Sequence, residues 1–154
     1  MDIFTYIKRD HRKVASLIDD LLAINLSYVR LNIFGQIRTE LTLHADAEEQ
    51  TFYRALDAAG QNGDLIERLH HAADDHEQMR ALMEVIDNTP ASSDFWMEKF
   101  GELKQAIAHH VAEEEQVVFP RARVLLSPQQ CRQLARDMDM LKADLVMEMQ
   151  APAL

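Results

Sequence analysis

The chain has 154 residues, of which 47% are hydrophobic and 27% are charged, so the sequence predicts a single soluble domain over residues 1–154 that buries its own core. The formal net charge of −10 argues against a nucleic acid or an anionic membrane as partner, because both bind basic patches. A single cysteine excludes an internal disulfide and a cysteine-ligated metal cluster.

Glycine and proline are scarce, at 4 each, and no segment has the pattern of a strand. Long stretches of helical periodicity are separated by short breaks instead. We predict helices at about 2–23, 27–58, 64–87, 93–119 and 127–150. Short connections favour antiparallel neighbours, so the expected fold is all-α: an up-down-up-down four-helix bundle over about 1–122 with an additional C-terminal helix at about 127–150.

Two of these helices carry capping signals at their starts. Asp64 and Glu67 have the spacing of a capping pair for the third helix. Ser127 is followed by Pro128, which suits the first helical position, and by Gln130 three residues after the cap. We therefore expect Asp64 and Ser127 to be the residues at which their helices begin.

The first four predicted helices each carry apolar residues at steps of three and four, the spacing of a core-facing stripe. Four histidines and two glutamates fall within these stripes: His11, His44, Glu48, His76, His110 and Glu114. Beyond them the second stripe continues through Thr51 and Ala55, and the fourth through Val117. At a rise of ~1.5 Å per residue, the six polar side chains come to similar depths and can meet in one layer.

Buried glutamates point to a metal more strongly than buried histidines do. A single core histidine is usually explained by a hydrogen bond to a backbone carbonyl. An ionised carboxylate in an apolar interior is costly unless it is paired or binds a metal. No lysine or arginine lies in the stripes to pair with Glu48 or Glu114, and imidazole with carboxylate suits iron, manganese or zinc.

The sequence also contains an internal repeat, in which an Asp-His pair is followed by a His-x-x-x-Glu motif. The two copies are Asp10-His11 with His44-x-x-x-Glu48, and Asp75-His76 with His110-x-x-x-Glu114. The repeat predicts two helical hairpins related by a pseudo-two-fold axis. Residues i and i+4 lie on the same helix face, so the histidines and the glutamate of each hairpin should face the other hairpin. This arrangement predicts a symmetric cradle for two metal ions.

This order of residues resembles the hemerythrin-like, or HHE cation-binding, domain family over about residues 1–122. Short sequence motifs are similar too, notably Asp-His near the start and His-x-x-x-Glu-Glu followed by an aromatic residue. The resemblance implies a non-haem di-iron centre with an oxo or hydroxo bridge, for which zinc or manganese could substitute. It implies bridging by Glu48 and Glu114 and terminal ligation by the histidines: His11, His44, His76 and His110.

The chain departs from the five-histidine pattern of oxygen-carrying hemerythrins. It has Ala72 four residues before His76, where those proteins look like His-x-x-x-His. A missing fifth histidine leaves one metal with an open or water-filled position, which favours reactivity or sensing over reversible oxygen carriage. His70, His71 and His109 are expected to face away from the site, with a local helix irregularity at His71 as the alternative.

Several residues beside the stripes need a separate interpretation. The acidic ones are Asp10, Glu49, Asp75, Glu113 and Glu115. We expect them to be solvated, and for the glutamates a role next to the metal ligands or in iron entry is the alternative. Tyr6 and Tyr53 are expected to pack in the core, with a phenol hydrogen bond or an extra metal ligand as the alternative.

The last predicted helix carries its own apolar stripe, formed by Leu134, Met138, Leu141, Leu145 and Met149. Such a stripe suits either covering the bundle or pairing with a second subunit, so a homodimer through this helix is one expectation. Cys131 is expected to be a buried, inert thiol, with a lowered pKa in the first turns as the alternative.

The expected function is binding of O2 or NO, or reaction with peroxide, at a di-iron centre, with iron storage or donation as a further role. The other hypotheses are a peroxidase- or catalase-like enzyme, a metal-dependent sensor that docks a partner without turnover, and a structural bundle without metal. No apolar run approaches the ~20 residues that span a bilayer. The first residues do not form a signal segment, so we expect a cytoplasmic protein with no membrane partner.

Overall fold

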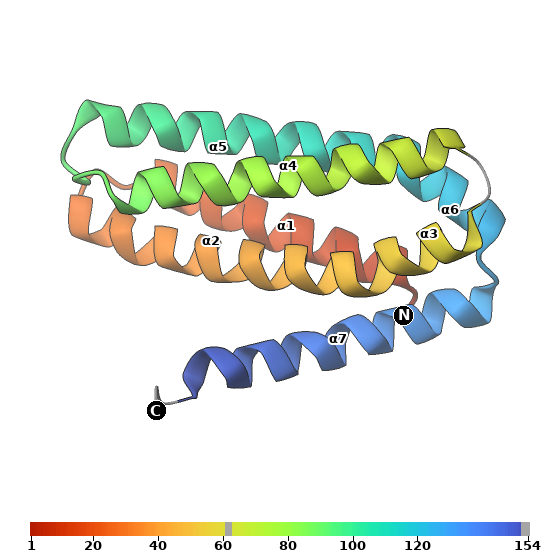
Figure 1. Ribbon diagram of the computed structural model, residues 1–154. Helices are drawn as coiled ribbons and strands as arrows, with labels where there is room; N and C mark the ends of the chain where they lie inside the picture. The colour runs from red at the N-terminus through yellow and green to blue at the C-terminus, as the bar shows by residue number, and fades with distance from the viewer. Residues whose placement is uncertain (61–62, 152–154) are drawn as a thin grey trace.

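The computed structural model describes residues 1–60 and 63–151, which form helices joined by short connections with no strand among them. Four helical rods run side by side, each antiparallel to the one before it (Figure 1). The elements are α1 (Ile3–Leu22), α2 (Ser27–Glu48), η1 (Glu49–Tyr53), α3 (Arg54–Ala59), α4 (Gly63–Asp87), α5 (Asp94–Glu113), η2 (Glu114–Val118), α6 (Phe119–Leu125) and α7 (Pro128–Gln150). The predicted all-α four-helix bundle with an additional C-terminal helix is confirmed. None of the helices described is long and apolar enough to cross a membrane.

The second and fourth rods are composite. α2, η1 and α3 form one continuous rod, and α5, η2 and α6 form the other. In each rod a π-helical turn lies at the end of the His-x-x-x-Glu motif: η1 begins directly after Glu48, and η2 begins at Glu114 itself. A π turn holds one residue more than an α turn, so it rotates every later side chain away from the regular pattern.

This rotation overturns the stripes expected beyond the two motifs. In the second rod Phe52, Tyr53 and Leu56 are buried, whereas Thr51 and Ala55 are only half-buried. The apolar stripe has therefore moved by one residue, and this shift brings Tyr53 inward. Periodicity could not reveal the change, because it assumes a constant angle per residue.

The fourth rod shows the same shift and a later end than expected. Val118 is buried in place of Val117, which is half-buried. The rod was expected to end near Phe119 but continues to Leu125. Pro120 does not stop it, because it comes directly after the π turn, where the regular α-helical hydrogen-bond pattern is already interrupted.

The helix starts agree with the capping signals in one case and not in the other. Ser127 and Gln130 bond to each other's backbone N–H groups in a reciprocal capping box at the start of α7. The expectation at Asp64 is wrong, because α4 already begins at Gly63. Asp64 lies in the first turn and pairs with Arg121 of α6 instead. Position 62, which precedes α4, lies outside the described residues.

The interior is divided into two apolar cores. One gathers around Phe52, Leu56 and Phe119, near α3 and α6. The other gathers around Phe34 and Trp96, near the starts of α2 and α5. Close packing on both sides holds the four rods in a fixed rotation, so the side chains between the two cores have defined positions.

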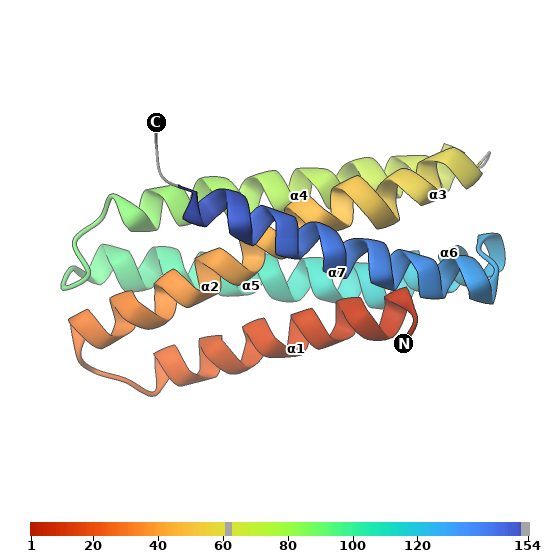
Figure 2. The ribbon, with the colours of Figure 1, turned by 90° about the horizontal axis from the view of Figure 1, so that it is seen from below.

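α7 lies along the outside of the bundle, beside α1 and α2 (Figure 2). Its first half is buried through Cys131, Leu134, Ala135 and Met138. Leu141 and Leu145 are partly buried against the same core, whereas Met149 is exposed. The stripe on α7 therefore covers the bundle, and a homodimer through this helix stays a prediction. Burial raises the pKa of the Cys131 thiol, so the alternative of a lowered pKa is wrong.

Candidate metal centre

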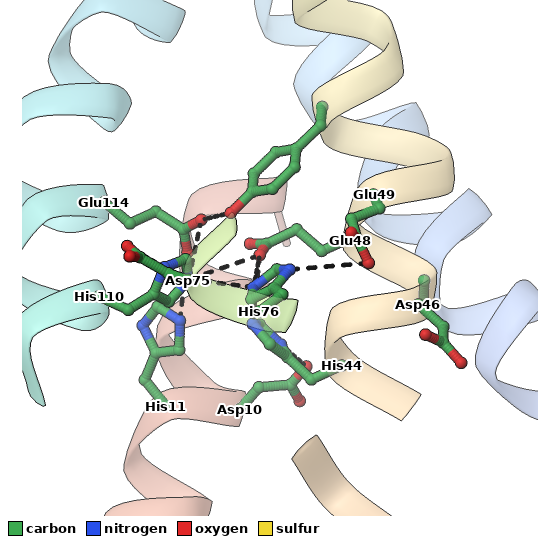
Figure 3. Close-up of polar contacts among 12 residues, drawn as sticks. Asp10, His11, His44, Asp46, Glu48, Glu49, Asp75, His76, His110 and Glu114 are labelled. Atoms are coloured by element: carbon green, nitrogen blue, oxygen red, sulfur yellow. Dashed lines mark hydrogen bonds and ion pairs between the residues drawn. The ribbon is translucent and has the colours of Figure 1, made fainter. Parts of the chain in front are cut away.

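All six polar residues of the stripes meet in one layer between the two apolar cores, called the polar layer below. Four rods contribute to it, with the side chains pointing toward one another (Figure 3). The members are His11 of α1, His44 and Glu48 of α2, His76 of α4, His110 of α5 and Glu114 of η2. Each is buried, and Glu48 is 0% exposed. The structure thus brings together every residue that the sequence assigned to the site.

Within the polar layer the side chains form two groups whose nitrogen and oxygen atoms lie close enough to surround an ion. The first group is His11, His44, Glu48 and Glu114, and the second is Glu48, His76 and His110. In each group these atoms all lie within 4.8 Å of one another. Glu48 belongs to both groups, since its Oε1 lies 3.4 Å from Nε2 of His44 and 3.3 Å from Nε2 of His76.

Glu114 also faces histidines of both hairpins. Its Oε1 lies 3.2 Å from Nε2 of His11, and its Oε2 lies 3.6 Å from Nε2 of His110. The two carboxylates therefore occupy the middle of the layer, and the imidazoles surround them. This arrangement matches the pseudo-two-fold symmetry of the sequence repeat.

Several atoms of the layer lack the hydrogen bonds that buried polar atoms normally make. One is Nδ1 of His76, on the outer side of its ring. Those that face the centre are both carboxylate oxygens of Glu48, Oε1 of Glu114, and Nε2 of His11 and His44. A buried polar atom without a partner costs roughly 1–3 kcal/mol, and more when it is charged. The atoms that face the centre converge from different helices, and all of them are lone-pair donors that suit a divalent cation. The residues present therefore fit a metal centre.

Each of the four histidines has a carboxylate near its outward-facing nitrogen. The Nδ1–oxygen distances are 2.8 Å for His11 to Glu115, 2.9 Å for His44 to Asp10, 3.7 Å for His76 to Glu49 and 3.4 Å for His110 to Asp75. We call these four acids the outer carboxylates. A carboxylate that takes the Nδ1 proton leaves Nε2 free to bind a metal and fixes the ring orientation.

The expectation that the outer carboxylates would all be solvated is wrong. Asp10 is buried, and the others are half-buried. Each of them lies within 4 Å of a histidine on a different helix from its own, so the periodicity of a single helix cannot reveal the contact. The signal that could have found them is the repeat itself, because an Asp precedes His11 and His76 and a Glu follows Glu48 and Glu114.

The remaining candidates take other roles. Glu113 pairs with Arg68 at 2.5 Å, away from the histidines. His70, His71 and His109 are exposed, as expected. Tyr6 does not reach the polar layer, since its hydroxyl donates to Oδ1 of Asp139 on α7 at 2.8 Å.

Tyr53 does reach the polar layer, because the π turn rotates it inward. Its hydroxyl donates a short hydrogen bond to Oε2 of Glu114. Its ring stacks on His76, with 5.6 Å between the ring centroids and 11° between their planes. Burial and the nearby glutamates raise the pKa of the Tyr53 phenol well above its ordinary value, so it stays a hydrogen-bond donor. Of the two roles considered for this residue, the phenol hydrogen bond is observed.

Without a metal, protons on the histidines balance the glutamates. Burial by itself lowers a histidine pKa, but Glu48 and Asp10 outweigh it at His44 and raise its pKa to about 10. At His76, burial is likewise outweighed by Glu48 and Glu49, and the pKa rises to about 9. Burial also opposes the charge on Glu48, yet His44 and His76 hold its pKa well below the usual range. In the metal-free protein, protonated histidines therefore supply the positive charge that metal ions would supply in the loaded protein.

A small apolar cavity adjoins the histidines. All four imidazoles line it, together with apolar side chains that include Val14, Leu41, Met79 and Ile107. The space open to the centre of a water-sized sphere is about 20 Å³. That is room for a single water-sized molecule. The cavity therefore favours a ligand of very few atoms.

α7 reaches the polar layer through one side chain that sequence analysis missed. Nζ of Lys142 makes a short ion pair with Oδ2 of Asp10, the same atom that contacts His44. The Lys142 side chain is 14% exposed, so water screens this pair only in part. Nothing in the stripe of α7 pointed to Lys142, because the contact depends on how α7 docks.

We predict that Lys142→Met will weaken metal binding by about tenfold, the lower end of the range for partners that orient metal ligands. The ammonium holds Asp10 in place, and Asp10 orients His44. The matched control is Lys99→Met, which removes a lysine that pairs with Glu102 at 2.8 Å on the surface. Metal titration of both variants measures the effect. Equal affinities would show that α7 does not support the site.

The fold and the polar layer together define a helical cation-binding bundle. Residues 2–122 match the Hemerythrin HHE cation binding domain, and the chain belongs to that family. α7 lies beyond the matched residues.

The chain is also similar to a solved structure and to a curated protein. The chain is similar to a crystal structure of a hemerythrin HHE cation binding domain-containing protein, an Rv2633c homolog from Mycobacterium kansasii, with a TM-score of 0.82 and 19% identity. That likeness covers 98% of this chain and 93% of the other, and it shows the fold. Among curated proteins, a DNA nickase of Nostoc sp. is 31% identical over 143 residues. This match covers 93% of the present chain and 40% of the nickase, so the chain spans two fifths of that relative.

Proposed function

We propose that the polar layer binds two metal ions, with iron as the first candidate and zinc or manganese as substitutes. The proposed ligands are His11, His44, Glu48 and Glu114 for one ion, and Glu48, His76 and His110 for the other, with Glu114 also within reach of the second. The observation that carries the proposal is Glu48, whose buried oxygens make no hydrogen bond and face both groups of histidines. Such a carboxylate suits a bridge between two cations.

The two ions would differ in how completely the protein surrounds them. The group around His76 contains three residues, whereas the group around His11 contains four. Ala72, at the place of a fifth histidine, has no side-chain donor to offer. This difference supports an exchangeable position on the ion held by His76 and His110, next to the apolar cavity.

We further propose that the centre binds or reacts with a small molecule such as O2, NO or peroxide, and that iron storage or donation is a further use. Two irons would supply the electrons for such a reaction. The chain's own part is to hold the imidazoles through the outer carboxylates and to keep the cavity small and dry. Tyr53 adds a hydroxyl that donates to Glu114 and fixes that carboxylate.

The first test is the metal content per chain after expression in iron-supplemented medium, with an absorption spectrum of the same sample. We expect about two irons per chain, as in two-metal sites. Addition of azide, NO and hydrogen peroxide then tests ligand binding, and turnover of peroxide would identify an enzyme. A single zinc would favour a structural or regulatory site, and a folded protein that takes up no metal would contradict the proposal.

A metal-dependent sensor without turnover is the second candidate, and the contact between Lys142 and Asp10 favours it. Through this contact, the orientation of His44 and the docking of α7 depend on each other. Nucleic-acid cleavage is not part of the proposal, because a chain with a net charge of −10 is poorly suited to contact phosphates.

A further inference from the structure

The pseudo-two-fold symmetry creates two equivalent interfaces between helices of different hairpins. We call each of these interfaces a seam. In the sequence repeat α1 corresponds to α4, and α2 corresponds to α5. The seam between α2 and α4 is therefore the counterpart of the seam between α1 and α5. If the two copies of the repeat had the same side chains, both seams would be equally open to solvent. They do not, and the difference falls beside the metal ligands.

Charged side chains close the α2–α4 seam. Nη2 of Arg80, four residues after His76, lies 2.6 Å from Oδ1 of Asp46 and 2.6 Å from Oε2 of Glu49. Arg80 belongs to α4, whereas its partners belong to the second rod, so the pair of contacts crosses the seam. Arg80 also lines the apolar cavity from that side.

The α1–α5 seam has alanines at two of the three corresponding places, and the third is Glu115, the counterpart of Glu49, which contacts His11. Ala15 stands four residues after His11, as Arg80 does after His76. Ala112 stands two residues after His110, as Asp46 does after His44. Alanine has no group that could cross the seam.

The result is a surface groove of about 470 Å³ between α1 and α5. Ala15, Ala108 and Ala112 line it, and His11 is among its lining residues. Asp19, Lys104 and Glu115 also line the groove. Glu115 is held by Nδ1 of His11 at 2.8 Å, and the two remaining charges are opposite in sign.

Only a thin wall separates this groove from the apolar cavity inside. His11, Ile107 and Val111 line both spaces. Val111 is half-buried, and Ile107 is 7% exposed. Val111 is the most exposed member of this wall, and partly exposed side chains change rotamer faster than helices move, so rotation of Val111 is the smallest change that opens the wall.

We propose that the α1–α5 seam is the entrance to the metal centre for neutral or singly charged molecules of two or three atoms. Ile107 and Val111 form the wall that such a molecule passes, and Arg80 keeps the opposite seam shut. The proposal rests on the proposed function, because it assumes a metal centre that small molecules must reach.

The test introduces residue types of the α2–α4 seam at the corresponding positions of the α1–α5 seam. The double variant Ala15→Arg with Ala112→Asp places at the α1–α5 seam the residue types that Arg80 and Asp46 have at the other. Stopped-flow mixing of the iron-loaded protein with azide measures the association and dissociation rates. We expect both rates to fall at least about tenfold while the equilibrium affinity stays nearly constant, since an entrance changes the barrier and not the bound state.

The matched control adds the same two charges outside the groove. Ser16→Arg with Gln105→Asp changes exposed residues on the same two helices and should leave both rates unchanged. If the double variant loads poorly, Ala112→Leu fills the groove without a charge and is expected to slow both rates. Unchanged rates in a fully loaded seam variant would overturn the proposal.

Failure of the proposed function would be visible in the unmodified protein. If it holds iron but binds no azide, binding of azide at the centre is wrong, and the seam is then judged by the rate at which dissolved O2 oxidises the ferrous protein. Closure of the seam should slow this oxidation as well. An oxidation rate that does not respond to seam closure would overturn the entrance.

Discussion

The metal-free protein is expected to lose stability as the pH rises from about 6.5 to about 10, whereas the metal-loaded protein is not. The folded-state pKa is raised from 6.5 to about 10 for His44 and to about 9 for His76. A raised histidine pKa stabilises the folded state fully below the unfolded value, and this contribution is lost as the pH rises through the folded value. When the protons leave, nothing balances the charge on Glu48.

In the loaded protein, metal ions replace those protons. The gain in stability on loading should therefore grow with pH, and loading should release protons. At a free metal concentration of ~100 times the dissociation constant, the gain is ~2.7 kcal/mol, or a rise in Tm of about 5–10 °C for a chain of this size.

Thermal unfolding with a chelator and with metal, across this pH range, measures the effect. A metal-free protein whose Tm does not change with pH would show that the histidines are not protonated partners of Glu48. A Tm that does not respond to metal at any pH would contradict the metal centre itself.

Glu48→Gln is the single substitution expected to affect the site most. The change keeps the shape of the side chain but removes the charge that both groups of the polar layer share. Substitution of residues that only orient metal ligands costs 10- to 100-fold in affinity, so loss of a shared ligand should cost more than about 100-fold for both ions. Metal content after dialysis and titration with ferrous iron measure this loss.

The metal-free Glu48→Gln variant should also lose most of the pH dependence described above. Without the carboxylate, the cause that raises the pKa of His44 and His76 is largely removed. The control is Glu113→Gln, an identical change next to Glu114 that removes only the pair with Arg68. Retention of two tightly bound ions by Glu48→Gln would contradict a bridging role, whatever happens to stability.

The differences between the two copies of the repeat carry as much information as their symmetry. The symmetric part supplies the polar layer and its outer carboxylates. The asymmetric part sets Arg80 and Asp46 on one seam and Ala15 and Ala112 on the other. The proposed two-metal site would need four rods that face one another, whereas the proposed route for small molecules would need only one opening. The two proposals together would account for seams that differ around matching candidate ligands.

The sequence by itself determined the helices and the members of the polar layer. Each of these properties depends on the spacing of residues along one helix, and that spacing decides which face a side chain takes. Charge arguments then made Glu48 and Glu114 candidates for metal binding before any contact was known. The resemblance in sequence covered the same bundle that the family match covers.

Only the tertiary structure decided which residues surround that layer. The outer carboxylates contact histidines of other helices, and Lys142 of α7 contacts Asp10 of α1, so their roles depend on how helices are rotated and docked. Tyr53 points inward because η1 interrupts the regular helix, and a constant angle per residue predicts the wrong face beyond such a turn. The spacing of residues along a helix therefore determines which side chains lie on its buried face, whereas packing between helices determines which groups those side chains contact.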